Sequence, residues 1–153
     1  MYTYIKVTKE AIFVNSIILF DGECNFCDSS VRFIIKRDRN ARFHFASIQS
    51  NIGQKLLTDL QVPPHLDSLI LIENGKWHAQ STAALHISRH LNGGWKLFSV
   101  LLLVPKPMRD VIYKFIAKNR YKWFGKKEAC MLPSPEIRKR FLSWLIGGYL
   151  WKK

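Results

Sequence analysis

The stretch that decides the fold runs from Ser16-Ile-Ile-Leu-Phe20 into Asp21-Gly-Glu-Cys-Asn-Phe-Cys-Asp28. Its first five residues are mostly apolar and rich in β-branched side chains, which is typical of a buried strand. Asp21-Gly22 is a turn dipeptide. Beyond it, apolar residues recur at near-helical spacing between positions 31 and 35, before a basic run. We therefore predict a strand, a turn, and a helix that begins close to Cys24 and ends in a basic turn, as the helix dipole favours.

Further strand and helix patterns follow this unit along the chain. Residues 43–46 alternate as a second strand would, and Ser50 is placed to cap a helix that stops before Pro63. Apolar runs on both sides of Asn74-Gly75 predict a β-hairpin over residues 68–79. The Asn-Gly pair supports this hairpin because it supplies the positive φ values that a tight turn needs.

A last helix of this region is predicted between Ser81, as its N-cap, and Asn92-Gly93-Gly94. The order of elements is then strand, helix, strand, helix, hairpin and helix. A βαβ unit followed by a ββα unit describes a thioredoxin-like domain. The predicted fold class is therefore α/β, with a thioredoxin-like core over residues 1–94, of which residues 1–15 give no clear pattern.

Residues 95–153 are predicted to form a helical, basic extension packed on this core within one structural domain. The expected helices are Trp95 to Val104, Pro105 to about Lys118, and Pro135 to about Leu150. The chain has 24 Lys and Arg against 11 Asp and Glu, a formal net charge of +13, and residues 105–153 carry +10 of it. Such a basic region indicates an anionic neighbour, such as RNA, phospholipid headgroups or an acidic protein, or else a well solvated surface.

Two apolar stripes at helical spacing run through this extension. Their members are Trp95, Leu97, Phe98, Leu101 and Leu102 in the first, and Val111, Ile112, Phe115 and Ile116 in the second. We expect both stripes to be core contacts. The alternative is an amphipathic surface on an anionic membrane, for which the aromatic segment Ile137–Lys153 is the strongest candidate. Nucleic-acid binding is disfavoured, because no RNA-binding or helix-turn-helix signature is present.

The most informative feature for chemistry is the pair Cys24 and Cys27, two residues apart at the predicted start of a helix. Thiols at this spacing can lie close enough to form a disulfide. The unpaired backbone N–H groups and the dipole of a helix start favour the thiolate, which is the species that attacks disulfides. We therefore predict an enzyme of thiol–disulfide exchange, with Cys24 as nucleophile and Cys27 as resolving thiol. This chemistry needs no organic cofactor.

Two other interpretations of the cysteine pair stay open. Zinc commonly takes four ligands, and the chain has a single C-x-x-C pair, so Cys130 and a histidine would have to complete a site. The cysteines could also be small buried hydrophobic residues. The rival to an enzyme is therefore a binding module, either a zinc-holding adaptor or a peripheral membrane protein with a vestigial dithiol.

Acidic residues surround the dithiol, namely Asp21, Glu23 and Asp28. Their negative charge disfavours a nearby thiolate and so opposes the helix start. One hypothesis reconciles the two effects: Asp21 is buried and partly protonated, and shuttles a proton to or from Cys27. The alternative is that Asp21 only begins the turn and holds Gly22 through an Asx-type hydrogen bond.

The run that contains Asp21, Cys24 and Cys27 resembles the signature of the DCC thiol-disulfide oxidoreductases, which are named for these three residue types. The likeness continues in a second block, Asn119-Arg-Tyr-Lys-Trp-Phe-Gly125, and then in Cys130-Met-Leu-Pro133. The resemblance implies a thioredoxin-like core with extra helices. It also implies a redox-active dithiol that exchanges with a protein or small-molecule thiol or disulfide.

The chain departs from better-known thioredoxin-like enzymes, which place a cis-proline just before the third core strand. Asp67-Ser68 stand at that place here, which weakens the case for binding an extended peptide. Cys130 follows Lys126-Lys127, whose charges favour a thiolate. We expect Cys130 to be a buried structural residue in the loop before Pro133, and the alternative is a second resolving or regulatory thiol.

The cysteine count and the apolar runs bear on location. Three cysteines cannot form a fully paired disulfide framework. The first residues lack the apolar core and cleavage site of a secretory signal. The longest apolar run, residues 97–104, is far shorter than the roughly 20 residues of a spanning helix. We expect a cytoplasmic protein, whose thiols are kept reduced.

Overall fold

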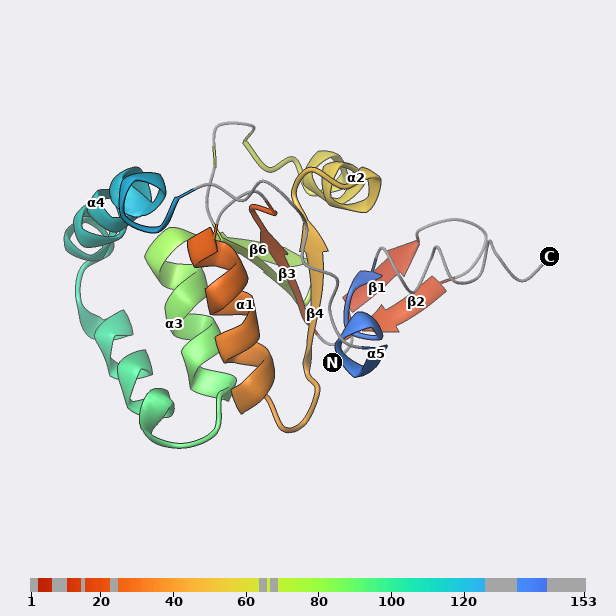
Figure 1. The fold of residues 1–153 in the computed structure, drawn as a ribbon, viewed down its shortest axis with the longest axis horizontal. Helices are drawn as coiled ribbons and strands as arrows, with labels where there is room; N and C mark the ends of the chain where they lie inside the picture. The colour runs from red at the N-terminus through yellow and green to blue at the C-terminus, as the bar shows by residue number, and fades with distance from the viewer. Residues whose placement is uncertain are drawn as a thin grey trace.

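The centre of the fold is a four-stranded mixed sheet, seen in a computed structural model of the chain (Figure 1). The structure describes residues 3–6, 11–14, 16–22, 25–63, 66, 69–125 and 135–142. Its strands are β1 (Thr3–Lys6), β2 (Ala11–Val14), β3 (Ser16–Phe20), β4 (Phe43–Ser47), β5 (Ile70–Glu73) and β6 (Lys76–Ala79). Its helices are α1 (Asn25–Arg37), α2 (Asn51–Asp59), α3 (Gln80–His90), the 3-10 helix η1 (Gly94–Leu103), α4 (Lys106–Phe124) and α5 (Pro135–Arg138).

The strand order in the sheet is β4-β3-β5-β6. β3 runs parallel to β4, with Ser16 opposite Phe43 and Phe20 opposite Ser47. β5 is antiparallel to β3, and β6 is antiparallel to β5. This topology confirms the predicted α/β fold with a thioredoxin-like core, a βαβ unit followed by a ββα unit. β1 and β2, where the sequence pattern was unclear, form a separate two-stranded antiparallel sheet.

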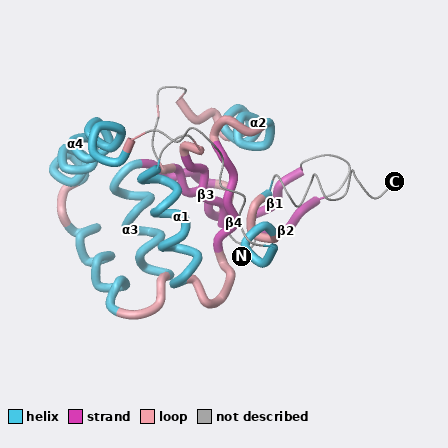
Figure 2. Tube along the Cα trace, in the orientation of Figure 1, coloured by secondary structure: helices cyan, strands magenta, loops and turns pink. Residues whose placement is uncertain are grey.

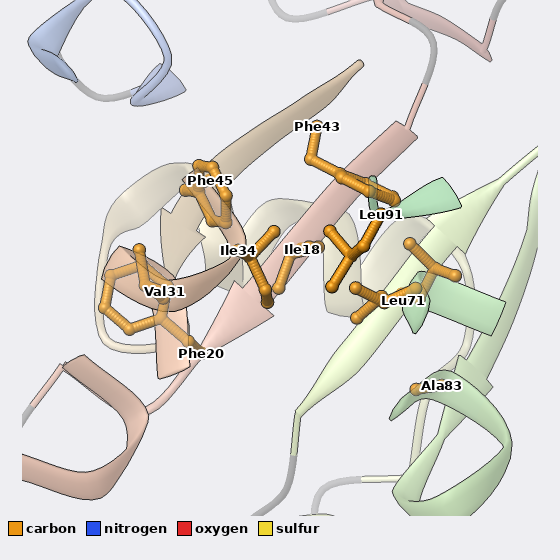
Figure 3. Close-up of a cluster of buried hydrophobic side chains, with 10 residues drawn as sticks. Ile18, Phe20, Val31, Ile34, Phe43, Phe45, Leu71, Ala83 and Leu91 are labelled. Carbon is orange, nitrogen blue, oxygen red and sulfur yellow. The ribbon is translucent and has the colours of Figure 1, made fainter. Parts of the chain in front are cut away.

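The predicted buried strand, β3, is one of the two inner strands of the sheet. All five residues of β3 are buried, and they alternate between the two faces of the sheet. Ile17 and Leu19 pack with α2, while Ile18 and Phe20 pack with α1 and α3. Figure 3 shows the second cluster, in which Val31 of α1 lies against these strands. The core is therefore two hydrophobic layers, one on each face of the sheet.

The tube view separates the helices into layers (Figure 2). α1 and α3 lie side by side on one face of the sheet, and α2 covers the other. η1 and α4 lie outside α1 and α3, farther from the strands. Phe33 and Trp95 hold η1 against α1, with their ring centroids 4.7 Å apart in an edge-to-face contact. This contact type adds specific geometry to apolar burial.

Two helix boundaries and the type of one helix differ from the sequence prediction. Ser81 is not an N-cap: α3 begins after Ala79 with no side-chain cap, and the Ser81 hydroxyl donates instead to Asp110 of α4. The segment predicted over residues 95–104 is a 3-10 helix. α4 continues to Phe124, well beyond the expected end at Lys118, because the next helix-ending residue is Gly125, at a positive φ of 74°.

The last predicted helix does not run unbroken from Pro135. α5 ends at Arg138, and Phe141 then forms a bridge with Phe45 of β4. The Phe45 N–H donates to the Arg140 carbonyl at 2.8 Å, so this segment pairs with the outer edge of β4. Leu142 is buried in the core. Phe141 and Leu142 are therefore core residues and not part of a membrane-facing surface, and residues 143–153 lie outside the described residues.

The prediction that both apolar stripes of the extension are core contacts is wrong for most of their residues. Trp95 does pack on α1, as predicted. The exposed members are Leu97, Phe98, Leu101, Val111, Ile112, Phe115 and Ile116. The reason is that α4 turns a different, partly polar stripe toward the core, including the buried Asp110 and Arg120. Among the described residues, no helix combines the length and apolar character needed to span a bilayer.

Gly53 is required by the packing of α2 on the end of β4. A Cβ at this position would lie 2.1 Å from the Ser47 carbonyl oxygen, whereas one at Gly94 would meet nothing within 4 Å. Helix propensity alone favours alanine over glycine. We nevertheless predict that Gly53→Ala lowers the free energy of unfolding by about 1 to 3 kcal/mol, because the backbone must shift.

Urea unfolding followed by circular dichroism checks this prediction. Gly94→Ala is the matched control, and we expect it to change stability by less than about 0.5 kcal/mol. A Gly53→Ala protein as stable as the original would show that α2 does not pack this closely on Ser47.

Candidate active site

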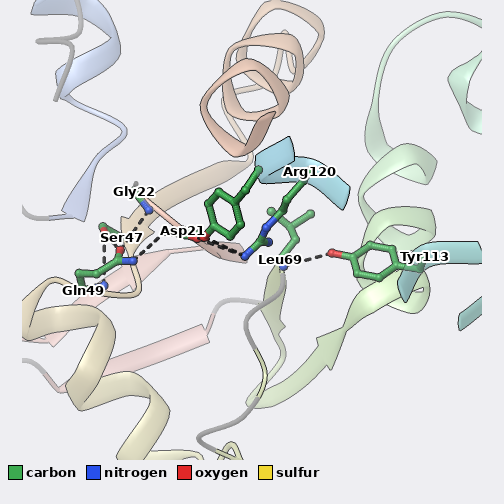
Figure 4. Close-up of polar contacts among 8 residues, drawn as sticks. Asp21, Gly22, Ser47, Gln49, Leu69, Tyr113 and Arg120 are labelled. Atoms are coloured by element: carbon green, nitrogen blue, oxygen red, sulfur yellow. Dashed lines mark hydrogen bonds and ion pairs between the residues drawn. The ribbon is translucent and has the colours of Figure 1, made fainter. Parts of the chain in front are cut away.

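The candidate site lies at the edge of the sheet where two parallel strands end. Asp21 directly follows β3, and Ser47 is the last residue of β4, opposite Phe20. Because the carboxyl ends of neighbouring parallel strands meet at one edge, this is the usual place for a site in an α/β sheet. α1 begins at Asn25, four residues after Asp21. The polar contacts at this edge are drawn in Figure 4.

Asp21 is buried, and three described side chains donate to its carboxylate. Gln49 Nε2 donates to Oδ1 at 2.8 Å. Arg120 Nη2 donates to Oδ2 at 3.1 Å, and the Tyr121 hydroxyl donates to the same oxygen. The side chains of Asp21 and Arg120 are only 9% and 5% exposed, so the two form a buried ion pair. Hydrogen bonds in which the acceptor is charged are stronger than neutral ones.

Gln49 ties this carboxylate to the turn that leads toward the cysteines. Its Oε1 accepts from the Gly22 N–H at 3.0 Å and from Ser47 Oγ at 2.5 Å. Ser47 Oγ in turn accepts from the Gln49 N–H at 3.2 Å. The Gln49 side-chain amide therefore forms hydrogen bonds through both of its polar atoms: Nε2 donates to Asp21, and Oε1 accepts from the backbone N–H of Gly22. This network fixes the position of the turn relative to the ends of both parallel strands.

α4 is held in register by polar contacts along one side. In the first half of α4, Asp110 accepts a hydrogen bond from the Ser81 hydroxyl. Farther along, the Tyr113 hydroxyl oxygen accepts from the Leu69 N–H at 3.3 Å (Figure 4). Arg120 lies seven residues after Tyr113, which is two turns farther along the same side. α4 thus places the Arg120 guanidinium beside Asp21, although the two residues are 99 positions apart in the sequence.

The charges at Asp21 bear on both hypotheses for this residue. Burial of the carboxyl agrees with the first hypothesis, but its protonation and any proton transfer to Cys27 stay predictions. The Gly22 N–H donates to Gln49. An Asx-type hydrogen bond would join Asp21 to the N–H two residues on, at Glu23, which lies outside the described residues, so the second hypothesis also stays a prediction. Burial, followed by the hydrogen bond to Asp21, raises the pKa of Tyr121 to about 12. Tyr121 is therefore a neutral donor near pH 7.

The cysteines themselves are only partly placed. Cys27 is the third residue of α1, as the predicted helix start requires, but the structure describes its backbone alone. Cys24, Glu23 and Cys130 lie outside the described residues, as do Asp67-Ser68. Within the described part of the chain, no group of three or more His, Cys, Asp and Glu side chains could hold a metal ion.

A cavity of about 500 Å³ adjoins this site between α1, α3 and α4. Ser29 and Ser30 contribute from α1, and Tyr113, Ala117 and Arg120 from α4. Most of the remaining lining is aliphatic or aromatic. Arg120 thus borders the cavity as well as contacting Asp21, which joins the two features through one side chain.

Sequence reasoning did not assign roles to Gln49, Arg120 and Tyr121. Arg120 and Tyr121 belong to the second block that resembles the DCC proteins. The resemblance therefore marked these two residues, but it did not indicate that they contact Asp21. Gln49 sits in the turn after β4 with no local pattern to mark it. Its role follows from the parallel pairing of β3 and β4, which brings the two turns together.

We predict that Arg120→Met lowers the free energy of unfolding by about 3 kcal/mol, because it leaves the buried Asp21 carboxylate without its counter-charge. The variant Asp21→Asn/Arg120→Met removes both charges, and we expect a coupling energy of more than about 1 kcal/mol between the two sites. Denaturant unfolding of the single and double variants measures this coupling energy.

Lys118→Met, an exposed change on the same helix, is the control and should change stability by less than about 0.5 kcal/mol. Additive effects of the two substitutions would contradict a direct ion pair.

Comparison with known proteins shows the family of the chain. The family model described as DCC1-like thiol-disulfide oxidoreductase matches residues 18–126. The uncharacterized protein YuxK of Bacillus subtilis (strain 168) is 55% identical over 137 residues, which cover 89% of this chain and 99% of that protein. A chloroplastic DCC family protein of Arabidopsis thaliana is 36% identical over 118 residues, or 76% of this chain and 69% of that protein. No solved structure matches. The chain belongs to the DCC1-like thiol-disulfide oxidoreductase family.

Proposed function

We propose that this protein is a thiol-disulfide oxidoreductase whose reacting groups are Cys24 and Cys27. The observation that carries the proposal is where the C-x-x-C segment falls in the fold. Its last three residues, up to Cys27, are the first three of α1, and Asp21, four residues before Asn25, is fixed at the end of β3. The first backbone N–H groups of a helix have no partner inside the helix and favour an anion nearby. Cys24 directly precedes these groups in the chain.

The proposed exchange proceeds in two balanced steps. The Cys24 thiolate attacks one sulfur of a substrate disulfide, so that a mixed disulfide forms and the other substrate sulfur leaves as a thiolate. The Cys27 thiolate then attacks the Cys24 sulfur, which releases the second substrate thiolate and forms the Cys24–Cys27 disulfide. The substrate gains two electrons and the dithiol loses two. A thiol of the glutathione or dithiol class would reduce the pair again, and the reverse sequence would oxidise a substrate.

Arg120 has a supporting role in this proposal. The sequence placed the Asp21 carboxylate near the dithiol, where its charge opposes a thiolate. The guanidinium 3.1 Å from Oδ2 offsets that charge within the site. Arg120 and Tyr121 are therefore positioning residues, because they act through Asp21. Asp21 itself is proposed to take up the proton of Cys27 as the resolving step begins, and to return it when the Cys24–Cys27 disulfide is reduced.

We predict a reversible two-electron couple for Cys24 and Cys27, with a potential in the range of known oxidoreductases, about −270 to −120 mV. Equilibration in glutathione buffers, followed by alkylation of free thiols and mass spectrometry, measures it. Cys24→Ser and Cys27→Ser should each abolish the couple, whereas Cys130→Ser should leave it unchanged if Cys130 is structural. An altered couple in Cys130→Ser would instead assign a redox role to that thiol.

A trapping experiment separates the roles of the two cysteines. With Cys27→Ser, a mixed disulfide on Cys24 cannot be resolved, so substrates should accumulate as covalent adducts on that residue. Cys24→Ser is the matched control and should trap nothing. Equal capture by both variants would overturn the assignment of Cys24 as nucleophile. Stoichiometric zinc in the purified protein, without any redox couple, would favour the zinc-holding adaptor over the enzyme.

A further inference from the structure

α4 presents its apolar side to solvent. Its buried residues are charged, Asp110 and Arg120. Val111, Ile112 and Phe115, by contrast, are 68%, 65% and 62% exposed. An ordinary surface helix of a soluble protein has the opposite arrangement, with an apolar stripe toward the core and polar residues outside.

η1 extends the same kind of surface. Leu97 is 73% exposed and Leu103 is 85% exposed, and Val100 and Leu101 are also exposed. η1 and α4 are consecutive in the chain and together form the outermost layer beside α1 and α3 (Figure 1). Every large exposed apolar side chain found among the described residues whose exposure is known belongs to these two helices. Exposed apolar groups gathered in this way mark a surface that binds something.

The charges on these helices are of one sign. Five lysines are exposed, namely Lys96, Lys106, Lys114, Lys118 and Lys122. Asp110 is the single acidic residue between positions 94 and 125, and it is buried against Ser81. No carboxylate on either helix therefore offsets the exposed lysines. We call the exposed apolar and lysine side chains of η1 and α4 the outer surface.

We propose that the outer surface binds a lipid bilayer that carries anionic phospholipids. The apolar side chains enter the boundary between headgroups and acyl chains. The lysine ammonium groups bind the negative headgroups, while the methylene chains of the lysines lie against the apolar layer. This differs from the sequence prediction, which placed the strongest membrane candidate after Ile137. The proposal is independent of the dithiol chemistry, because it uses no residue of the candidate active site.

The charge pattern favours a bilayer over a second copy of the chain. A symmetric dimer through the outer surface would place its lysines against the same lysines of the partner, with no acidic residue of this surface to pair with them. A protein partner that binds an amphipathic helix usually takes one stripe of its apolar side chains into a hydrophobic groove. The apolar groups here are spread over two helices of different geometry, and a fluid lipid surface accommodates that arrangement without a matching groove.

Vesicle flotation of the full-length protein tests the proposal. We expect binding to vesicles of phosphatidylcholine with 30% phosphatidylglycerol in roughly 0.1 M salt, and binding that weakens as salt is raised, since surface charges are screened. Lys114→Glu/Lys118→Glu should weaken partitioning by about tenfold or more. Arg39→Glu/Lys76→Glu makes the same charge change at exposed positions outside η1 and α4, and should have a much smaller effect.

A second pair of variants tests the apolar part. Ile112→Ser/Phe115→Ser should also reduce partitioning by about tenfold or more, and circular dichroism and thermal unfolding will show that both variants remain folded. Equal binding by the Lys114/Lys118 and Arg39/Lys76 variants would overturn the proposal, because the attraction would then follow net charge alone. A chain that dimerises in light scattering, with dimerisation lost in Ile112→Ser/Phe115→Ser and no vesicle binding, would assign the outer surface to self-association instead.

Discussion

The buried ion pair between Asp21 and Arg120 fixes the rotation of α4 about its axis. Two charges removed from water are unfavourable unless they are close and well hydrogen bonded. Arg120 can meet Asp21 only if α4 has one rotation about its axis. At 3.6 residues per turn, that rotation places Val111 and Phe115 on the opposite side. The exposed apolar face of α4 is therefore a geometric consequence of the contact that completes the candidate site.

In the proposed function, the same ion pair offsets part of the negative charge that the sequence places next to the dithiol. The sequence places acidic residues around Cys24, whereas a reactive cysteine needs an electropositive setting. Arg120, on a helix distant in the sequence, supplies a positive charge to Asp21. Tyr121 and Gln49 complete the shell around the carboxylate without adding charge. The proposed redox function thus depends on the extension beyond residue 94 as well as on the thioredoxin-like core.

Local patterns predicted the core well. β3, α1 and the β5–β6 hairpin follow from apolar runs, helical spacing and the Asn74-Gly75 turn, all of which act over a few residues. Ser50 is the N-cap of α2, as predicted, with its hydroxyl oxygen accepting from the Gly53 N–H. Such features are set by backbone conformation and by nearby hydrogen bonds, so a single sequence reveals them.

The contacts that complete the site could not be predicted in this way. Arg120 meets Asp21 across 99 residues, and nothing in the local sequence of either residue specifies the other. Periodicity shows that a helix has an apolar side but not whether that side faces the core. The prediction of core packing for Val111 and Phe115 was wrong for this reason, since buried polar anchors decided the rotation of α4.

The most direct test of this account is the pH dependence of Cys24 alkylation in the original protein, in Arg120→Met and in Asp21→Asn/Arg120→Met, each shown to be folded. We expect Arg120→Met to move the alkylation profile to higher pH, because the uncompensated carboxylate disfavours the thiolate, and the double variant to move it back. Identical profiles for the original protein and Arg120→Met would contradict it.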